Sequence, residues 1–177
     1  MHNVELRKVE VNDLEALQKI SQETFAETFS GENTPENMKK YLTESFSKEK
    51  LSAEMAEPHS SFYFAELHND IIGYLKLNVE DAAADRKEVK SLEIERIYVR
   101  RGFHGKKVGN ALLEKAIEEA RAISASYLWL GVWEHNLRAI HFYRKYGFEI
   151  AGSKLFRLGE DEQTDFIMKL QLQYEHC

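Results

Sequence analysis

A short basic loop that contains glycine follows an apolar segment and could bind an anion. The apolar segment covers residues 91–99, the loop carries Gly105, Lys106, Lys107 and Gly109, and a helical pattern follows. The first N–H groups of a helix lack partners within the helix, and the helix dipole is positive at that end. Such a loop therefore suits phosphate. An ordinary strand-to-helix turn is the alternative interpretation, because short glycine motifs have low specificity.

Two glutamates in the apolar segment could accept a proton or bind a cation. Glu93 and Glu95 are two positions apart, so on a regular strand they share a face with Ile97 and Val99. The opposite face then carries Leu92, Ile94 and Tyr98. A strand that is apolar on both sides is internal, and carboxylates there are costly unless they are paired or functional. The pair could deprotonate an ammonium group or anchor a cationic substrate. The alternatives are an ion pair with a cation such as Arg96 and an exposed strand end.

A tyrosine lies on the apolar face of a later helix. Asn136 can cap this helix, Tyr143 follows Phe142 along it, and Gly147 stands where a left-handed C-terminal cap is expected. A phenol is uncharged near neutral pH and can donate a hydrogen bond. On the residues alone, a tyrosine at this position is more typical of a packed core than of a catalytic acid.

Periodicity and capping residues predict a mixed α/β fold that would position these side chains. The expected strands cover residues 4–9, 61–67, 71–79, 91–99, 127–133 and 148–152, with a last hairpin of 155–158 and 164–170 around 159–162. The expected helices cover residues 12–29, 34–46, 48–56, 108–123 and 136–146. Residues 80–90 are polar and are expected to form an exposed loop. Early hairpins and later strand–helix alternation predict one mixed sheet with helices on both faces, in a single domain over residues 1–177.

Composition limits the class of protein and its partners. The chain has 177 residues, of which 43% are hydrophobic and 31% charged, as in soluble globular proteins. No apolar run approaches the ~20 residues that span a bilayer, and the N-terminus lacks an apolar signal core. The one cysteine is Cys177, so no internal disulfide can form and a reducing cytoplasm is expected. The formal net charge of −6 argues against a broad basic surface for nucleic acid. The seven histidines show no metal-binding spacing, so no metal is expected.

Two blocks in a fixed order, with an expected strand between them, connect these features. The first is Ile97-Tyr98-Val99 followed by His104-Gly105-Lys106-Lys107-Val108-Gly109, and the second is Asn136-x-x-Ala139-x-x-Phe142-Tyr143-x-x-x-Gly147-Phe148. Together they resemble the GNAT superfamily of acyl-CoA-dependent N-acetyltransferases. That family's signature is Gln or Arg, two residues, Gly, one residue, then Gly or Ala. Here His104 replaces the first position and Lys107 the first glycine, where a close backbone approach or a positive φ favours glycine.

The resemblance is more specific over nearly the whole chain. The segments TFAETF, ENTPENMKKYL, SLEIERIYV, WLGVWEHN and EDEQTDFIMKL resemble the bacterial PaiA group of spermidine/spermine N-acetyltransferases. This resemblance implies a GNAT fold, with a mostly antiparallel sheet of about seven strands and helices on both faces. It also implies transfer of an acetyl group from acetyl-CoA directly to a primary amine, in a ternary complex with no covalent enzyme intermediate. A polyamine would be the acceptor.

The resemblance assigns roles by position. Tyr143 matches the family's general acid, and Glu93 its general base, with Glu95 as the second candidate. The backbone of Ile97, Tyr98 and Val99 would bind the pantetheine arm and the thioester oxygen. The residues implied in binding CoA are Ile97, Tyr98, Val99, His104, Gly105, Lys106, Lys107, Val108, Gly109, Asn110, Asn136, Ala139 and Tyr143. In this assignment the helix after the loop starts at Asn110, and Asn136 keeps its role as a cap.

The acceptor site is expected at two further places. Trp133 and Glu134 follow a strand and could border it, and Glu27, Thr28 and Phe29 could close it from the N-terminal helix. Carboxylates beside aromatic rings suit a polyamine through charge pairing and cation–π contact. Each of these residues, taken alone, is more typical of surface or core.

Other functions are consistent with the same residues. The acceptor could be a drug amine, an amino acid or a protein N-terminus. The chain could also be a CoA-binding regulatory protein with little catalysis, for which His104 and Lys107 are the only hints. Similar enzymes often form dimers, so a homodimer is possible, and no sequence signal indicates a membrane or nucleic-acid partner.

Overall fold

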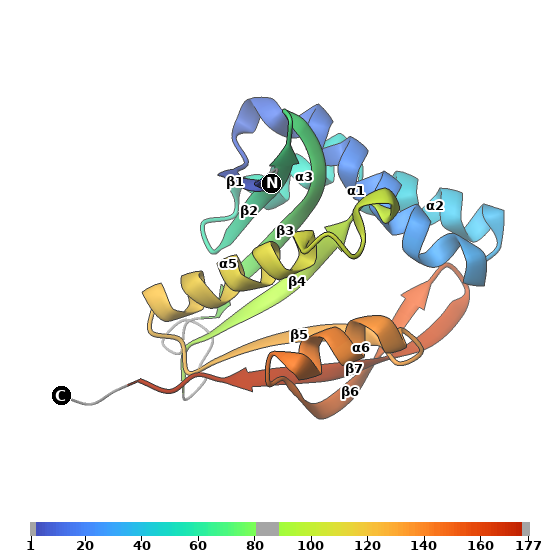
Figure 1. The fold of residues 1–177 in the computed structure, drawn as a ribbon. Helices are drawn as coiled ribbons and strands as arrows, with labels where there is room; N and C mark the ends of the chain where they lie inside the picture. The colour runs from blue at the N-terminus through green and yellow to red at the C-terminus, as the bar shows by residue number, and fades with distance from the viewer. Residues whose placement is uncertain (1–2, 81–88, 175–177) are drawn as a thin grey trace.

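The computed structural model describes residues 3–80 and 89–174. The expected loop over residues 80–90 therefore falls largely outside the described residues. In chain order the principal elements are β1 (Glu5–Lys8), α1 (Leu14–Phe29), α2 (Pro35–Ser45), α3 (Lys48–Ala56), β2 (Ser60–Leu67), β3 (Asp70–Glu80), β4 (Ser91–Val99), α5 (Val108–Ala122), β5 (Tyr127–Trp133), α6 (Leu137–Lys145), β6 (Glu149–Leu158) and β7 (Asp161–Gln171) (Figure 1).

Local capping residues set several helix boundaries as the sequence predicts. The side chains of Thr34, Ser47 and Asn136 each accept a hydrogen bond from the N–H three residues further on. Pro35 occupies the first position of α2, where its missing N–H costs nothing. Gly147 follows α6 with a φ of 99°, in the left-handed region that favours glycine. The helix after the basic loop, however, begins at Val108 rather than at Asn110.

The strands form one sheet in the order β1-β2-β3-β4-β5-β7-β6. Only β4 and β5 are parallel neighbours, and the other adjacent pairs are antiparallel. One hydrophobic core contains Leu112 and Leu113 of α5 and Ile140 of α6, while a second contains Leu17 of α1 and Leu51 of α3. The helices therefore cover both faces of the sheet, which confirms the predicted fold class (Figure 1).

The end of the chain differs from the prediction. Residues 149–158 form a single strand, with an irregularity in its pairing to β7 between Ile150 and Gly152, instead of two separate segments. The turn is also shorter than expected, because β7 begins at Asp161. Gly152, Ser153 and Lys154 all pair with residues of β7, so the strand does not end after Gly152.

A β-bulge in β4 overturns the predicted assignment of its two faces. Leu77 of β3 pairs with Ile94, and the preceding Lys76 pairs with Arg96, so Glu95 is an extra residue. One extra residue shifts the alternation of all later side chains to the opposite face. The expected grouping of Ile97 and Val99 with the glutamates is therefore wrong. These two pack on the core that holds Leu92 and Ile94, whereas Tyr98 packs on the core between the sheet and α1–α3.

The sheet separates between its two parallel strands. Pairing of β4 with β5 runs from Ser91 opposite Tyr127 to Ile94 opposite Leu130. Beyond that point β4 continues along β3 to Val99, and β5 continues along β7 to Trp133. The two strands diverge in Figure 1, and their facing backbone groups beyond Ile94 and Leu130 lack ladder partners in the described chain.

A close backbone contact holds the diverging end of β4 in place. A Cβ at Gly73 of β3 would lie 2.8 Å from the carbonyl oxygen of Tyr98. We expect Gly73→Ala to lower the free energy of unfolding by about 1–3 kcal/mol, measured by urea denaturation, because β4 must shift. Gly102→Ala is the control, since nothing lies within 4 Å of its Cβ position. Equal stability of the two variants would contradict the proposed constraint.

Candidate active site

A cavity of about 580 Å³ lies where β4 and β5 separate. Its wall combines both strands, the basic loop, α6 and aromatic residues from α1 and α2. The lining includes residues 93–99 and 130–133, and also Phe25, Thr28, Phe29, Tyr41, Phe103, His104, Gly105, Lys107, Val108, Gly109, Asn110, Asn136, Arg138, Ala139, Phe142, Tyr143, Lys154, Phe156 and Asp165. Most of the predicted CoA-binding residues and both predicted glutamates therefore meet at one cavity.

The basic loop forms one end of this cavity and fits a phosphate. Lys107 caps α5 with φ 64° and ψ 19°, so a lysine adopts the left-handed conformation that glycine provides in the family signature. The first N–H after it with a partner inside α5 is that of Ala111, so the three preceding amides lack intrahelical acceptors. Lys106 does not line the cavity, and its ammonium lies 5.4 Å from the ring centre of Phe103.

His104 connects this loop to α6 through a residue that the sequence interpretation missed. Its Nε2 lies 2.8 Å from the carbonyl oxygen of Val99, and its Nδ1 lies 2.7 Å from a guanidinium nitrogen of Arg138. A carbonyl can only accept and a guanidinium can only donate, so the ring is neutral, with its proton on Nε2. His104 thereby holds Arg138 at the cavity wall. An arginine in the first turn of a helix opposes the helix dipole, and this unfavourable placement was the available signal.

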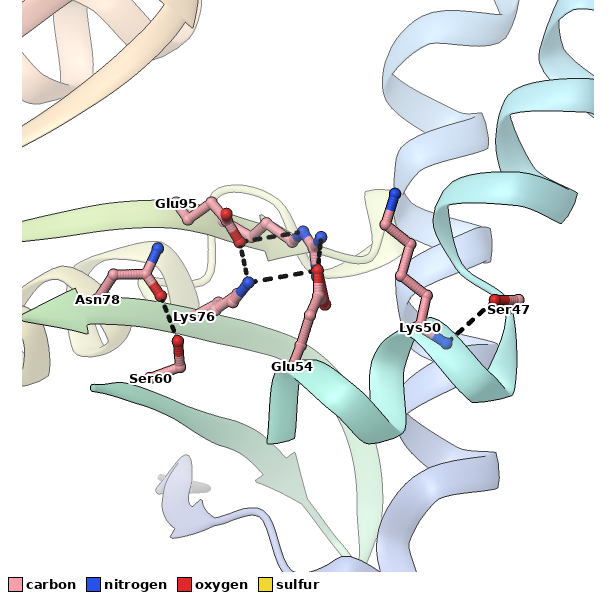
Figure 2. A network of polar contacts seen from close by, with 8 residues as sticks. Ser47, Lys50, Glu54, Ser60, Lys76, Asn78 and Glu95 are labelled. Carbon is pink, nitrogen blue, oxygen red and sulfur yellow. Dashed lines mark hydrogen bonds and ion pairs between the residues drawn. The ribbon is translucent and has the colours of Figure 1, made fainter. Parts of the chain in front are cut away.

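Glu93 faces the cavity as a half-buried carboxylate. Burial raises the pKa of Glu93, the nearby charge of Glu95 raises it further, and the charge of Lys154 opposes both effects. Asn78 donates a hydrogen bond to it. The amide oxygen of Asn78 in turn accepts a 2.7 Å hydrogen bond from Ser60 (Figure 2), which leaves its amide NH₂ to face Glu93. Glu93 can therefore exchange a proton closer to neutral pH than an ordinary glutamate.

Glu95 has a different environment, because two cations hold it. Its carboxylate forms an ion pair with Lys76 and lies 3.8 Å from the guanidinium of Arg96. Glu54 of α3 joins the same network, 3.3 Å from Lys76 and 2.8 Å from Arg96 (Figure 2). The Lys76 side chain is only 5% exposed, and these two carboxylates are the partners that compensate its buried ammonium group. The network fixes Glu95 at the bulge.

Tyr143 is a core tyrosine that also reaches the cavity. It is buried against Phe142 and Phe148, with ring centres 5.4 and 5.7 Å away. Burial raises the pKa of its phenol, so the hydroxyl keeps its proton. Within residues 3–80 and 89–174, no group accepts a hydrogen bond from this hydroxyl. Tyr143 is therefore packed in the core, as the residues alone suggest, and it also lines the cavity.

The expected acceptor residues divide into two groups. Thr28, Phe29 and Trp133 line the cavity. Glu27 does not, because its carboxylate accepts a 2.6 Å hydrogen bond from the N–H of Arg101 and ties α1 to the turn before the loop. Glu134 also lies outside the lining, 3.4 Å from the ring of His135.

Two charged residues from the last strands complete the wall, and the sequence interpretation did not include them. Asp165 of β7 pairs with Trp133 of β5 on one side and with Lys154 of β6 on the other. Burial raises the pKa of Asp165, while the charge of Lys154 opposes that shift. An aspartate within the regular alternation of β7 was the signal for an inward-facing carboxylate. The described residues contain no group of His, Cys, Asp and Glu side chains arranged to hold a metal ion.

The separated parallel strands, the loop at the start of α5 and the tyrosine of α6 line one cavity. The chain belongs to the GNAT family: the model described as "Acetyltransferase (GNAT) family" matches residues 14–148. It is an acetyl-CoA-dependent N-acetyltransferase. None of the described helices is long and apolar enough to cross a membrane.

Individual relatives support this assignment. An uncharacterized N-acetyltransferase of Lactobacillus delbrueckii subsp. lactis is 44% identical over 97% of this chain and 99% of its own length. A spermidine N(1)-acetyltransferase of Thermoplasma acidophilum is 27% identical over 94% of this chain and 96% of its own. The crystal structure of a PaiA N-acetyltransferase from the same organism, in complex with coenzyme A, superimposes with a TM-score of 0.79 at 25% identity. It covers 96% of this chain and 99% of that one.

Lys107 has a strained left-handed backbone conformation and also a positive charge at the cavity. Replacing it with glycine would remove both, and the two losses affect different measurements. We expect Lys107→Gly to raise the free energy of unfolding by about 0.5–1 kcal/mol, because it removes the Cβ clash of the left-handed region. The KM for acetyl-CoA should rise by about fivefold or less, because an exposed charge near the phosphates is lost. Denaturant unfolding and steady-state kinetics measure the two effects.

Lys106→Gly is the matched control for this variant. It removes the same charge from a residue without a positive φ that lies outside the cavity lining. We expect it to lower stability slightly and to leave the KM unchanged. If both variants change stability in the same direction, strain at Lys107 is not the cause.

Proposed function

We propose that this enzyme acetylates a cationic primary amine, with a polyamine such as spermidine or spermine as its acceptor. The observation that carries the proposal is that carboxylates and aromatic rings line the same cavity as the basic loop. The similarity to a spermidine N(1)-acetyltransferase is consistent with it.

The charge balance of this wall favours a cation. Lys76 and Arg96 compensate the charges of Glu54 and Glu95. Glu93 and Asp165 then face the single charge of Lys154, so the wall keeps an excess of negative charge. An ammonium group bound beside these carboxylates would restore neutrality in a partly desolvated site.

The rings beside these carboxylates suit the methylene segments of a polyamine. Phe29 lies 6.3 Å from Trp133 and 6.4 Å from Phe156, and Tyr41 lies 6.0 Å from Phe156, measured between ring centres. Aromatic faces bind both methylene groups and ammonium groups. Alternating apolar and cationic segments of an acceptor would therefore find matching surfaces.

The proposed chemistry uses three parts of the site. Acetyl-CoA supplies the acetyl thioester when it is bound. The N–H groups of β4 that β5 leaves unpaired stabilise negative charge as it develops on the carbonyl oxygen. Glu93 takes a proton from the acceptor's ammonium, directly or through water, and the phenol of Tyr143 gives a proton to the leaving sulfur.

The environments of the two glutamates favour Glu93 as the base. A general base works best with a pKa near the working pH, and burial moves Glu93 in that direction. Glu95 is paired with Lys76 and Arg96, so it is less available to a substrate proton and fixes the bulge.

Glu93→Gln tests this assignment through pH dependence. In the natural enzyme, kcat/KM should fall as the pH falls through the raised pKa of Glu93, because the base becomes protonated. The variant should lose this acidic limb and about 10²-fold or more in rate. A raised folded-state pKa means that the ionised carboxylate costs stability above that pKa, so the variant should be more stable at neutral pH. An unchanged pH profile would remove Glu93 from the role of base.

Tyr143→Phe tests the proposed acid. We expect kcat to fall by about 10²–10⁴-fold, because the leaving sulfur loses its proton donor. The aromatic packing is retained, so the melting temperature and the affinity for CoA, measured by calorimetry, should change little. Turnover equal to that of the natural enzyme would show that Tyr143 is structural only.

The acceptor is tested by following thiol release from acetyl-CoA with spermidine, spermine, a lysine peptide or no acceptor. Turnover selective for the polyamines supports the proposal, and turnover on the peptide alone rejects the polyamine. CoA binding without turnover on any acceptor would favour a regulatory protein. In Asp165→Asn the KM for spermidine should rise about tenfold, because one charged contact is lost, while the KM for acetyl-CoA should not change.

A further inference from the structure

Lys154 brings a primary amine of the protein into the acceptor side of the cavity. It belongs to the edge strand β6, and its side chain reaches across β7 towards β5. A Cβ at Gly131 would lie 2.9 Å from its Cε and 3.2 Å from its Nζ. Gly131 is the first residue of β5 beyond the last pair with β4, so the amine lies where the two strands separate.

We propose that Lys154 is an internal acceptor, and that the enzyme acetylates its ε-amino group in its own active site. The inference uses Glu93 and Tyr143 in the roles given above, and so rests on the proposed function.

The direction of the lysine side chain brings its amine towards the proposed base. Lys154 pairs with Asp165, and Asp165 pairs with Trp133. The ammonium nevertheless lies 5.7 Å from the ring centre of Trp129, which is the residue paired with Glu93. The backbone of Lys154 is therefore level with Trp133, while its ammonium lies closer to the level of the Trp129–Glu93 pair.

The Lys154 amine is near the carboxylates of Asp165 and Glu93 but forms no ion pair with either of them. An Oδ atom of Asp165 lies 3.6 Å from the same Cβ position above Gly131, and Glu93 senses the charge of Lys154. In residues 3–80 and 89–174, no carboxylate forms a hydrogen bond or ion pair with Lys154 within 4.0 Å. Lys76, in contrast, is held by Glu54 and Glu95 and does not line the cavity. Lys154 is therefore free to move its nitrogen towards the thioester.

The transfer needs no reagent besides acetyl-CoA. The Lys154 ammonium gives one proton to Glu93, which passes it to solvent. Its nitrogen forms a bond to the acetyl carbonyl carbon while the carbon–sulfur bond breaks, and Tyr143 protonates the sulfur. The second proton of the nitrogen restores the phenol. The products are N-acetyl-Lys154, free CoA and one proton.

The matched control for this reaction is Lys169 of β7. Its ammonium also lies over an aromatic ring, 4.3 Å from the centre of Tyr127, but it does not line the cavity. Direct chemical acetylation by acetyl-CoA would modify both lysines. Acetylation in the active site would select Lys154, because proximity makes the reaction effectively unimolecular.

The experiment incubates the full-length protein with acetyl-CoA and no acceptor, and quantifies acetylation of each lysine by peptide mass spectrometry. We expect Lys154 to be acetylated about tenfold or more faster than Lys169, at a rate independent of protein concentration. Saturating spermidine should protect Lys154, and Glu93→Gln should slow its acetylation without affecting Lys169. In Lys154→Arg, the single equivalent of thiol released without acceptor should disappear while turnover with an amine persists.

Equal acetylation of the two lysines, or a rate for Lys154 proportional to protein concentration, would overturn the inference. Turnover of free amines with Lys154 unmodified would reject the internal acceptor alone and leave the proposed function intact. Absence of both turnover and modification would reject the proposed function as well.

Discussion

The site depends on the separation of β4 and β5, two parallel strands that pair over only four residues each. Each strand keeps its other neighbour beyond that point, so the sheet stays intact while its centre opens. Backbone N–H groups that would complete a ladder are instead available to a ligand, and unpaired buried groups of this kind are costly without one. Gly73 allows β3 to approach the diverging end of β4 closely, and Gly131 leaves space beside β5.

The bulge at Glu95 links this backbone geometry to the charges. With one extra residue, Glu93, Arg96 and Tyr98 all face the side covered by α1–α3, while apolar side chains continue to fill the other core. Ion pairs of Glu95 and Arg96 with Lys76 of β3 and Glu54 of α3 then fix the bulge (Figure 2). The two carboxylates thus receive different environments: Glu95 is paired with cations, whereas Glu93 accepts a hydrogen bond from Asn78 and has a pKa raised by burial.

Local signals in the sequence were sufficient for most elements and for part of the site. Caps such as Thr34 and Asn136 act within one turn, so they predict helix starts without knowledge of the fold. The bulge was not predictable from alternation, because Glu95 fits a regular strand equally well until its pairing with β3 is known. Arg138, Lys154 and Asp165 were missed for a related reason. Each reaches the cavity through tertiary contacts, whereas Glu27, expected there, is drawn to Arg101.

In the basic loop, Lys107 replaces the glycine of the family signature but keeps the left-handed backbone conformation. Lys107 adopts a conformation that costs a residue with a Cβ about 1–2 kcal/mol, yet the loop keeps the shape that leaves the first amides of α5 free. His104 cannot supply the charge of the arginine found in the family signature, because its ring is neutral between Val99 and Arg138. It instead positions Arg138, so α6 adds a positive charge to that of Lys107 at this end of the cavity. The loop and α6 are therefore joined through one imidazole ring, which contacts Val99 and Arg138.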